Sequence, residues 1–454
     1  MHIAVINLHS SRNLGDAAIT VEMLSQLQAN FPGADISLVL NDPASHPQTT
    51  HLKTVGSFKT WTLKIDKNRR EIWRVWAAPF QLLIAVVALI SHRLWKKPLF
   101  LTRNRDKRRL LQTYFSADLI IGCGGQVLAT KRRLAISFYW IAFSILFAHW
   151  LGKPIYMFPQ TIGPLAAWHH RVITNFILKR TRLIMLRDRD LSLKTVVEPA
   201  LLEKTVVLPD AAFGLPGRSP AEGWRVLSRF GLGPVEGVPT IGLTLMNWSG
   251  MNVNFKSNQQ EQYEAAVVRL IQYIVNDLNG RVFLLGQVIG PSLTEDDRIV
   301  ARKVIERAGL HSPDLVLIED LTDLDDLMCV YAALDLLVGT RMHSTIMTLV
   351  SGVPVCAIGY LVEKTSGSLR WVGLQDFVCD INHISGDTLI ALFERTWQAR
   401  DETRAQLARI MPAVSAEAQR AGQLIAADWE LLQKHGHSGQ EKGRSMLKLG
   451  DYNS

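Results

Sequence analysis

An arginine and a histidine, Arg341 and His343, stand where a buried strand pattern gives way to a helical one. The apolar residues before Gly339 predict a strand, and those up to Val350 predict a short amphipathic helix. The strand-to-helix turn is where ligands bind in open α/β sheets, and a helix amino terminus favours anions. Arginine can hold a phosphate or carboxylate through two parallel bonds, and histidine can transfer a proton near neutral pH. We therefore predict chemistry on a small anionic substrate, with a solvated or salt-bridged surface pair as the alternative.

Polar turns also follow other predicted strands. Asn13, Gly15 and Asp16 stand just before a predicted helix, where Asp16 could bind a substrate hydroxyl or simply cap the helix. Gly125 and Gln126 follow a second strand, in a glycine-rich turn that lacks the spacing of a dinucleotide-binding fingerprint. Both turns are candidates for lining a cleft.

Four further residues end or follow predicted strands. Gln160 and Gln287 offer amide groups to a cleft. Arg187 could bind an anion or pair with Asp188, and Lys364 is a third cation within reach of a cleft. The sequence shows no His, Asp and Glu cluster with metal-ligand spacing, so we predict neither a metal nor a cofactor.

The elements that position these residues alternate between strand and helix patterns. Strand Ile3–Leu8 and a helix at 17–30 start the series, and it restarts at strand Thr240–Leu245. Such alternation predicts two Rossmann-like parallel α/β domains that face each other across a cleft. A chain of 454 residues with 48% hydrophobic residues can supply two sizeable cores.

The predicted domain limits follow from this alternation. We place an N-terminal domain at 1–215 and a linker region with one short helix at 216–239. A second domain is expected at 240–386 and a helical tail at 387–435, whereas the polar residues 436–454 are expected to be disordered. We also expect a helix from Asp190.

Positive charge is concentrated in an insert at about 60–110. The net charge is +9, and 13 of the 50 Lys and Arg residues lie between Lys64 and Arg109 with only three acids. The apolar run Leu82–Ile90 inside it is shorter than the roughly 20 residues that span a bilayer. The run has tryptophans on both sides, namely Trp73, Trp76 and Trp95. These features favour peripheral contact of residues 64–109 with an anionic membrane. The alternatives are a core helix with a solvated basic rim and a nucleic-acid surface, for which no recognisable module is present.

A second apolar stretch, Leu134–Leu151, contains no Asp, Glu, Lys or Arg. Its length alone would suit a membrane span. Because it lies between predicted strands Asp118–Gly122 and Pro154–Phe158, we favour a buried crossover helix. The four cysteines are far apart and suggest neither a zinc site nor disulfides. No secretory leader is visible, so we expect a cytoplasmic location at the inner face of the membrane.

Taken in order, these motifs resemble the polysaccharide pyruvyl transferases. The set comprises Asn13-Leu14-Gly15-Asp16, Gly124-Gly125-Gln126, Phe158-Pro159-Gln160-Thr161-Ile162-Gly163-Pro164, Arg187-Asp188, Pro209-Asp210-Ala211, Arg341-Met342-His343-Ser344, and Gly352-Val353-Pro354 with Lys364. The resemblance covers about residues 1–400 and implies a glycosyltransferase B-like fold. It also implies transfer of a pyruvyl group from phosphoenolpyruvate to a sugar as a cyclic ketal. Donor-binding roles are implied for Arg187, Arg341, His343 and Lys364, and the basic insert departs from the family's core pattern.

A mechanism follows as a hypothesis. Phosphoenolpyruvate carries a phosphate and a carboxylate, so we expect Arg341 to act with Arg187 or Lys364 as a clamp. The enol carbon must be protonated, and His343 is the expected catalytic acid. Two sugar hydroxyls then attack in turn, and the second displaces phosphate. The acceptor is expected to be a saccharide, with or without a lipid carrier, and nucleic acid is not expected as a partner. The residues expected to bind the acceptor or to line the cleft are Asn13, Gly15, Asp16, Gly125, Gln126, Gln160 and Gln287.

Two other functions stay open at this point. A nucleotide-sugar glycosyltransferase could use the same architecture, but such enzymes often place a glutamate shortly after the equivalent turn, and Thr345–Thr348 contains no carboxylate. A non-catalytic scaffold at the membrane surface is the second alternative, in which the basic insert recruits partners and the Arg341–His343 pair is incidental.

Overall fold

The computed structural model describes residues 1–46, 52–61, 78–196, 198–248, 258–290, 293–310 and 312–435. The chain forms two compact units, each with a parallel sheet, which confirms the predicted α/β class. The first unit comprises Met1–Ser11, Ile19–Leu208 and Gln419–Ser454, and the second comprises Arg12–Ala18 and Pro209–Ala418. Residues 62–77, which hold part of the predicted membrane-contact segment, and residues 436–454 lie outside the described residues.

Seven parallel strands form the sheet of the first unit in the order β3-β2-β1-β4-β5-β6-β7. Their bounds are β1 (His2–Leu8), β2 (Asp35–Leu40), β3 (Lys53–Gly56), β4 (Leu119–Gly122), β5 (Ile155–Gln160), β6 (Ile184–Leu186) and β7 (Thr205–Val207). The central strands β4 and β5 are fully buried, as their unbroken apolar sequences predict. The sequence analysis missed β3 and β7, which are short strands at the two edges of the sheet.

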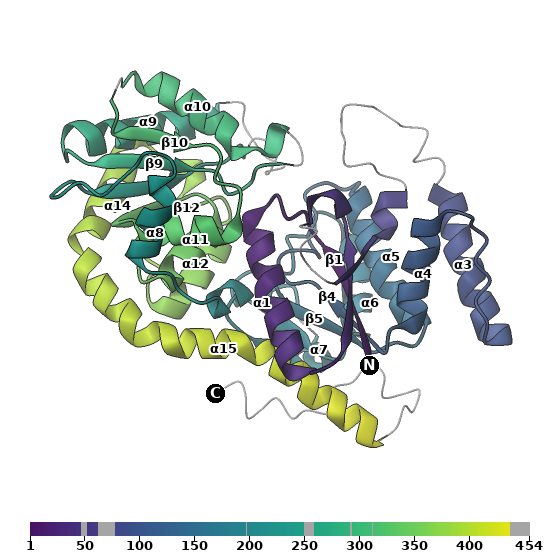
Figure 1. Cartoon of the computed structure of the whole chain (residues 1–454). Helices are drawn as coiled ribbons and strands as arrows, with labels where there is room; N and C mark the ends of the chain where they lie inside the picture. The colour runs from purple at the N-terminus through teal and green to yellow at the C-terminus, as the bar shows by residue number, and fades with distance from the viewer. Residues whose placement is uncertain are drawn as a thin grey trace. The chain divides into compact units, whose positions relative to one another are not determined.

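Helices cover both faces of this sheet. Their bounds are α1 (Leu14–Asn30), α3 (Ala78–Trp95), α4 (Arg105–Ser116), α5 (Ile136–Trp150), α6 (Trp168–Leu178) and α7 (Pro199–Leu202). From β1 to β2 the chain moves across the sheet in one direction, and from β3 through β6 it moves across the sheet in the opposite direction. Right-handed crossovers therefore place α1 on one face and α3 to α6 on the opposite face. Figure 1 shows α1 on one side of this sheet, with α5 and α4 on the other side and α3 beyond α4.

The two apolar segments of the first unit are helices that pack in its core. Helix α5 lies between β4 and β5 with Phe138, Ile145 and Phe147 buried, as expected of a crossover helix. Helix α3 buries one side only, including Ile84 and Leu89, in the same core. No helix in the described part of the chain combines the length and the apolar character that crossing a bilayer requires.

The second unit has a six-stranded parallel sheet in the order β10-β9-β8-β11-β12-β13. The strands are β8 (Thr240–Thr244), β9 (Arg281–Leu285), β10 (Leu315–Ile318), β11 (Leu336–Gly339), β12 (Val355–Gly359) and β13 (Val378–Asp380). The helices are α8 (Pro220–Ser228), α9 (Gln259–Asn276), α10 (Asp297–Ala308), α11 (Leu324–Ala332), α12 (Met342–Val350), α13 (Val362–Leu369) and α14 (Gly386–Gln398). Helices α9, α10 and α14 contribute to one hydrophobic cluster, whereas α8, α11 and α12 contribute to another. Strands β9 and β10 are added on one side of β8, and strands β11 to β13 are added on its other side. This change of side makes the carboxyl ends of β8, β9 and β11 the place where a ligand is expected.

Two details differ from the sequence-based expectations. Residues 216–239, expected as a linker region, belong to the second unit, where α8 packs against α11. The expected helix from Asp190 is wrong, because residues 190–195 form turns. There the carboxylate of Asp188 accepts bonds from the amides of Leu191 and Ser192, and such local side-chain bonds compete with helix formation.

The helical tail is α14 followed by α15 (Arg400–His435), which contributes residues to both units. Its last turns are held to the first unit by a buried ion pair. Nε of Arg182 lies 2.5 Å from Oδ2 of Asp428, and both side chains are fully buried. The hydroxyl of Tyr156 donates to the same carboxylate at 2.8 Å. Asp428 therefore fixes the tail to β5 and to the start of β6.

We expect Asp428→Ala to lower the stability of the first unit by about 3 kcal/mol. The substitution leaves the buried guanidinium of Arg182 without its partner, and broken buried pairs cost that much or more. Thermal unfolding followed by circular dichroism measures the effect. The matched control is Asp401→Ala on the same helix, where the carboxylate is 73% exposed and beside Arg400. Equal melting temperatures for the two variants would contradict this account of the tail.

Candidate active site

The turn between β11 and α12 positions the arginine and the histidine, as predicted. Arg341 is the N-cap residue of α12 with extended backbone, and His343 lies in the first turn of the helix. The hydroxyl of Ser344 bonds to the carbonyl of Arg341 and lies 2.7 Å from the hydroxyl of Thr244 at the end of β8. The turn is therefore fixed at the switch point of the second sheet.

Arg341 is held by a carboxylate to which the sequence analysis gave no role. Its Nε and one terminal nitrogen donate to the two oxygens of Asp297 at 3.2 and 2.5 Å. Burial raises the pKa of Asp297, while Arg341 and two backbone amides act in the opposite direction. A guanidinium in this position is oriented before any ligand arrives, and its other terminal nitrogen carries two further N–H donors.

Asp297 also connects Arg341 to the amino-terminal part of the chain. The amide of Val288 donates to Asp297 at 2.9 Å, and the amide of Asp297 donates back to the carbonyl of Val288 at 2.8 Å. Val288 pairs with Asn13 in an isolated antiparallel bridge. The amide of Leu14 donates to the carbonyl of Gln287 at 3.0 Å. The loop after β9 thus joins the predicted turn at 13–16 to the Arg341 turn.

Gly15 completes this ring of contacts. A Cβ atom on Gly15 would lie 2.5 Å from Nε2 of Gln287 and 2.5 Å from Nδ1 of His343. Only glycine allows the backbone to come so close, because atoms of other side chains would overlap there. The predicted residues Asn13, Gly15, Gln287 and His343 therefore form one constellation. Gln287 is buried, and its Oε1 has no hydrogen-bond partner among the described residues.

The amino terminus of α1 is capped by Asn13 and not by Asp16. The side-chain oxygen of Asn13 accepts from the amides of Gly15 at 3.1 Å and Asp16 at 3.4 Å. The amide nitrogen of Asn13 in turn donates to Asp16 at 2.8 Å. Of the two roles considered for Asp16, capping is therefore taken by its neighbour, and the Asp16 carboxylate is oriented by Asn13.

His343 has a second carboxylate beside it. Its Nε2 lies 3.6 Å from Oδ2 of Asp210, and the histidine side chain is 12% exposed. Asp210 is fixed because its other oxygen caps the short helix that follows it, accepting from the amide of Ala212 at 2.9 Å. The 3.6 Å separation is longer than a hydrogen bond, so Asp210 places a fixed carboxylate near the ring.

Lys364, in α13, is the third predicted cation and lies in the second unit. Its side chain is buried, and Nζ lies 5.9 Å from the ring centroid of Tyr360. Tyr360 is also close enough to Arg341 to act on its pKa electrostatically. The structure thus brings Lys364 into the neighbourhood of Arg341 through their common neighbour.

The remaining predicted residues lie in the first unit, at the carboxyl ends of β4, β5 and β6. Gly125, with a positive φ of 105°, pairs with Gln160 in a parallel bridge. Gln126 donates to the carbonyl of Gly163 at 2.7 Å. Arg187 is buried and donates from Nε to the hydroxyl of Thr161 at 2.9 Å. Gln160 is fully buried, and neither atom of its amide group has a hydrogen-bond partner in the described part of the chain.

Sequence reasoning missed the two acidic partners. Asp210 stood within a recognised motif but received no role, and Asp297 was not among the residues considered. No spacing signal links Asp297 to Arg341, because the two are 44 positions apart and meet only through the sheet. Asp210 could have been suspected, because an acidic residue inside a matching motif often orients a histidine.

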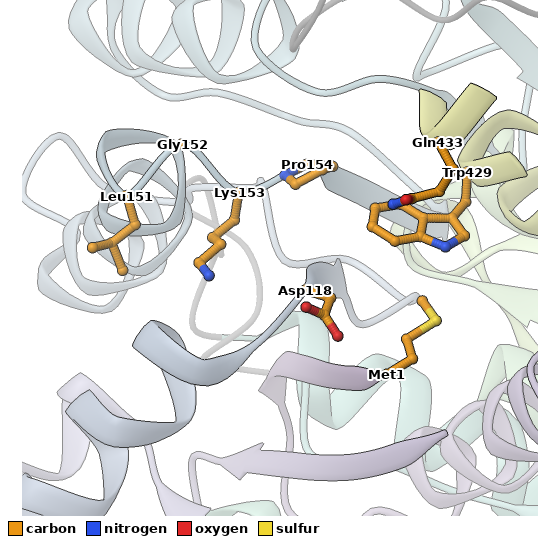
Figure 2. Close-up of a pocket in the computed structure, with 8 residues that line it drawn as sticks. All are labelled: Met1, Asp118, Leu151, Gly152, Lys153, Pro154, Trp429 and Gln433. Atoms are coloured by element: carbon orange, nitrogen blue, oxygen red, sulfur yellow. The ribbon is translucent and has the colours of Figure 1, made fainter. Parts of the chain in front are cut away.

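A pocket of about 660 Å³ lies elsewhere in the first unit, at the amino ends of its strands. Figure 2 shows its lining residues, Met1, Asp118, Leu151, Gly152, Lys153, Pro154, Trp429 and Gln433. The carboxylate of Asp118 accepts from the amide of His2 at 2.7 Å, and Lys153 donates to the carbonyl of Phe115 at 2.9 Å. Its charged groups thus bond to the backbone, and we assign the pocket no catalytic role.

Comparison with known proteins identifies the family. Residues 13–361 match the family model described as polysaccharide pyruvyl transferase. The chain belongs to the polysaccharide pyruvyl transferase family. This confirms the resemblance found in the sequence, and the match contains every predicted site residue except Lys364. A relative, the amylovoran biosynthesis protein AmsJ of Erwinia amylovora, is 26% identical over 431 residues, covering 90% of this chain and 95% of AmsJ.

Solved structures share the fold of this family member. Anabaena Alr3699/HepE, determined in complex with UDP and glucose, is 14% identical with a TM-score of 0.53 and matches 94% of this chain and 99% of its own. The UDP-GlcNAc 2-epimerase of Neisseria meningitidis, bound to UDP-GlcNAc, is 11% identical with a TM-score of 0.54, covering 96% of this chain and 100% of its own. These similarities establish a glycosyltransferase B-like fold.

The contact at Gly15 gives a test of the site's geometry. We expect Gly15→Ala to destabilise the second unit by about 1–3 kcal/mol, because the added methyl group overlaps Gln287 and His343. The control is Gly233→Ala, since an added Cβ there meets no atom within 4 Å. Urea unfolding measures both variants. If Gly15→Ala were as stable as the control, the close packing around His343 would be refuted.

Proposed function

We propose that this family member transfers the pyruvyl group of phosphoenolpyruvate to two hydroxyls of a sugar, forming a pyruvate ketal. The acceptor sugar belongs to a polysaccharide or to an oligosaccharide on a lipid carrier. The observation that carries the proposal is the ring of contacts joining Asn13, Gln287, Asp297, Arg341 and His343, residues spread across the part of the chain that matches the family. This ring gathers a fixed cation, a histidine and amide groups at the switch point of one sheet.

The donor has two anionic groups, and the second unit supplies two cations for them. Arg341 is oriented by Asp297, so its outer terminal nitrogen can donate to a phosphate or carboxylate without reorganisation. Lys364 is the second cation proposed for the same donor. Arg187 belongs to the first unit and is proposed as a further donor-binding residue on the strength of the family motif.

His343 is proposed as the acid that protonates the methylene carbon of the donor. Protonation turns that carbon into a methyl group and leaves the adjacent carbon electrophilic. The first sugar hydroxyl adds to this carbon and loses its proton. The second hydroxyl then displaces inorganic phosphate and loses its own proton as the ketal ring closes. Asp210 acts as a positioning residue, because its fixed carboxylate lies 3.6 Å from Nε2 of His343.

The acceptor is proposed to contact amide and carboxylate groups around the donor. Gln287 presents a buried carbonyl oxygen with no partner in the described part of the chain, which suits a sugar hydroxyl as donor. Asp16 and Asn13 lie beside it on the turn that contacts the Gln287 loop. For Gly125, Gln126 and Gln160, which belong to the first unit, a role in binding the acceptor is proposed on the sequence motifs alone.

Ligand-dependent thermal stability tests the donor. We expect phosphoenolpyruvate at 100 times its dissociation constant to stabilise the protein by about 2.7 kcal/mol through mass action. Arg341→Ala would leave the buried Asp297 carboxylate without its cationic partner, so Arg341→Lys is the sharper variant, and it should weaken the shift because lysine lacks the planar fork. Lys364→Met should weaken it as well. A shift that only UDP-sugars produce would reject this donor and favour a nucleotide-sugar glycosyltransferase.

A histidine substitution tests the acid. We expect His343→Gln to lower kcat for phosphate release at least about 100-fold while the dissociation constant of phosphoenolpyruvate changes little, because glutamine keeps the bulk but delivers no proton. The control is His383→Gln, since that histidine also lies beside an aspartate, at 3.1 Å from Asp380, but is 84% exposed. Near-normal turnover in His343→Gln would remove His343 from the chemistry.

A further inference from the structure

Helix α3 turns an apolar face outward. Five large apolar side chains on this helix are exposed, namely Phe80 at 62%, Leu83 at 51%, Ile90 at 48%, Leu94 at 67% and Trp95 at 67%. The first four fall on one side of the helix, because spacings of three, four and seven residues return to the same face. We call these five residues the α3 stripe. An ordinary surface helix would carry polar residues there.

The fold fixes the direction in which the α3 stripe points. The opposite side of α3 buries Ile84, Ala85, Ala88 and Leu89 in the core of the first unit. The rings of His92 on α3 and Phe115 on α4 lie 4.9 Å apart, edge to face. Arg93 donates to the carbonyl of Trp150 at the end of α5, at 2.9 Å. The helix therefore cannot turn its stripe inward without losing these core contacts.

Positive charge follows directly after the stripe. Between residues 93 and 109 the sequence has eight Lys and Arg residues and one acid, Asp106. Six basic residues beyond α3 are exposed, namely Lys96, Lys97, Arg103, Arg105, Arg108 and Arg109. Two exposed leucines, Leu99 and Leu101, are interleaved with them. The surface thus combines exposed apolar groups with a strong excess of cations.

We propose that the α3 stripe and the basic residues after it dock this protein on an anionic lipid bilayer. The helix lies in the plane of the interface, with Phe80, Leu83 and Ile90 among the acyl chains and Trp95 at the headgroup level. Lys96, Lys97 and Arg103 contact lipid phosphates. This inference goes beyond the proposed transferase activity and does not depend on it.

The chemistry of the surface favours a bilayer over a protein partner. Helices that lie in a membrane interface carry Trp, Phe and Leu on one face and Lys and Arg beside them. The interiors of protein interfaces are depleted of lysine, whereas anionic headgroups attract it. Within the described residues no helix qualifies as a membrane span, so contact along the surface is the mode that the geometry allows.

Vesicle flotation of the full-length protein tests the inference. The probes are vesicles of phosphatidylcholine alone and of phosphatidylcholine with phosphatidylglycerol. We expect binding to the anionic vesicles only, weakened by salt because part of the attraction is electrostatic. Leu83→Glu with Ile90→Glu should reduce the partition coefficient at least tenfold. Lys96→Glu with Lys97→Glu should also reduce it at least tenfold, since each basic residue contributes roughly a factor of five.

The matched control is Val235→Glu in the second unit, where the valine is 50% exposed. It makes the same kind of change as Leu83→Glu and should bind anionic vesicles like the unchanged protein. All the variants alter exposed positions, so their melting temperatures should equal that of the unchanged protein. If the variant Leu83→Glu with Ile90→Glu has a lower melting temperature, the variant Lys96→Glu with Lys97→Glu decides the outcome, because neither lysine contributes to the core.

Three results would overturn the inference. The first is no flotation of the unchanged protein with anionic vesicles. The second is flotation that survives in the α3 variants, in particular if Val172→Glu abolishes it, because α6 also exposes Trp168, Val172 and Phe176. The third is a dimer in analytical ultracentrifugation that Leu83→Glu with Ile90→Glu separates while vesicles do not bind, since a second copy of the chain would then cover the stripe.

Discussion

A buried guanidinium and a buried carboxylate are stable only when they pair closely, because each has lost its water. Arg341 and Asp297 meet this condition, and the pair connects the turn after β11 to the start of α10. Asp297 exchanges two backbone hydrogen bonds with Val288, which pairs with Asn13. Two residues further along, Gly15 packs against His343. Removing the Asp297 carboxylate would leave Arg341 without its ion pair and the amide of Val288 without its acceptor, and so the orientation of Arg341 depends on it.

This ring explains how residues far apart in sequence can act on one small substrate. Transferring a pyruvyl group requires cations for two anionic groups and an acid aimed at one carbon, all held in place before the substrate binds. Arg341 receives its orientation from Asp297, and His343 is confined between Asp210 and Gly15. Because these supports lie within the second unit, its contribution to the site is formed by its own contacts.

The first unit has two helices of similar apolar composition, α3 and α5, that differ in how much of their surface is buried. Helix α5 crosses from β4 to β5 and lies against the sheet, so its aromatic residues are mostly buried. Helix α3 buries Ile84, Ala85, Ala88 and Leu89 on one side, and five of its large apolar side chains remain exposed. Hydropathy alone could not separate these cases, and the sequence analysis favoured a buried helix at Leu134–Leu151 because predicted strands flank it. Whether the apolar side chains of a helix are buried in the core or exposed to a partner depends on how many neighbouring elements cover that helix.

The sequence by itself determined the class of fold, because parallel strands buried on both faces have continuous apolar runs. It also determined the family, through ordered motifs such as Arg341–Ser344. The strands predicted at Ile3–Leu8 and Thr240–Leu245 agree with β1 and β8 to within one residue, since their patterns are local. The tertiary structure alone decided that Asp297 pairs with Arg341 and that Asn13 caps α1 in place of Asp16. It also decided which side of α3 faces outward. These outcomes depend on contacts between segments far apart in the chain, and no local pattern of side chains encodes such contacts.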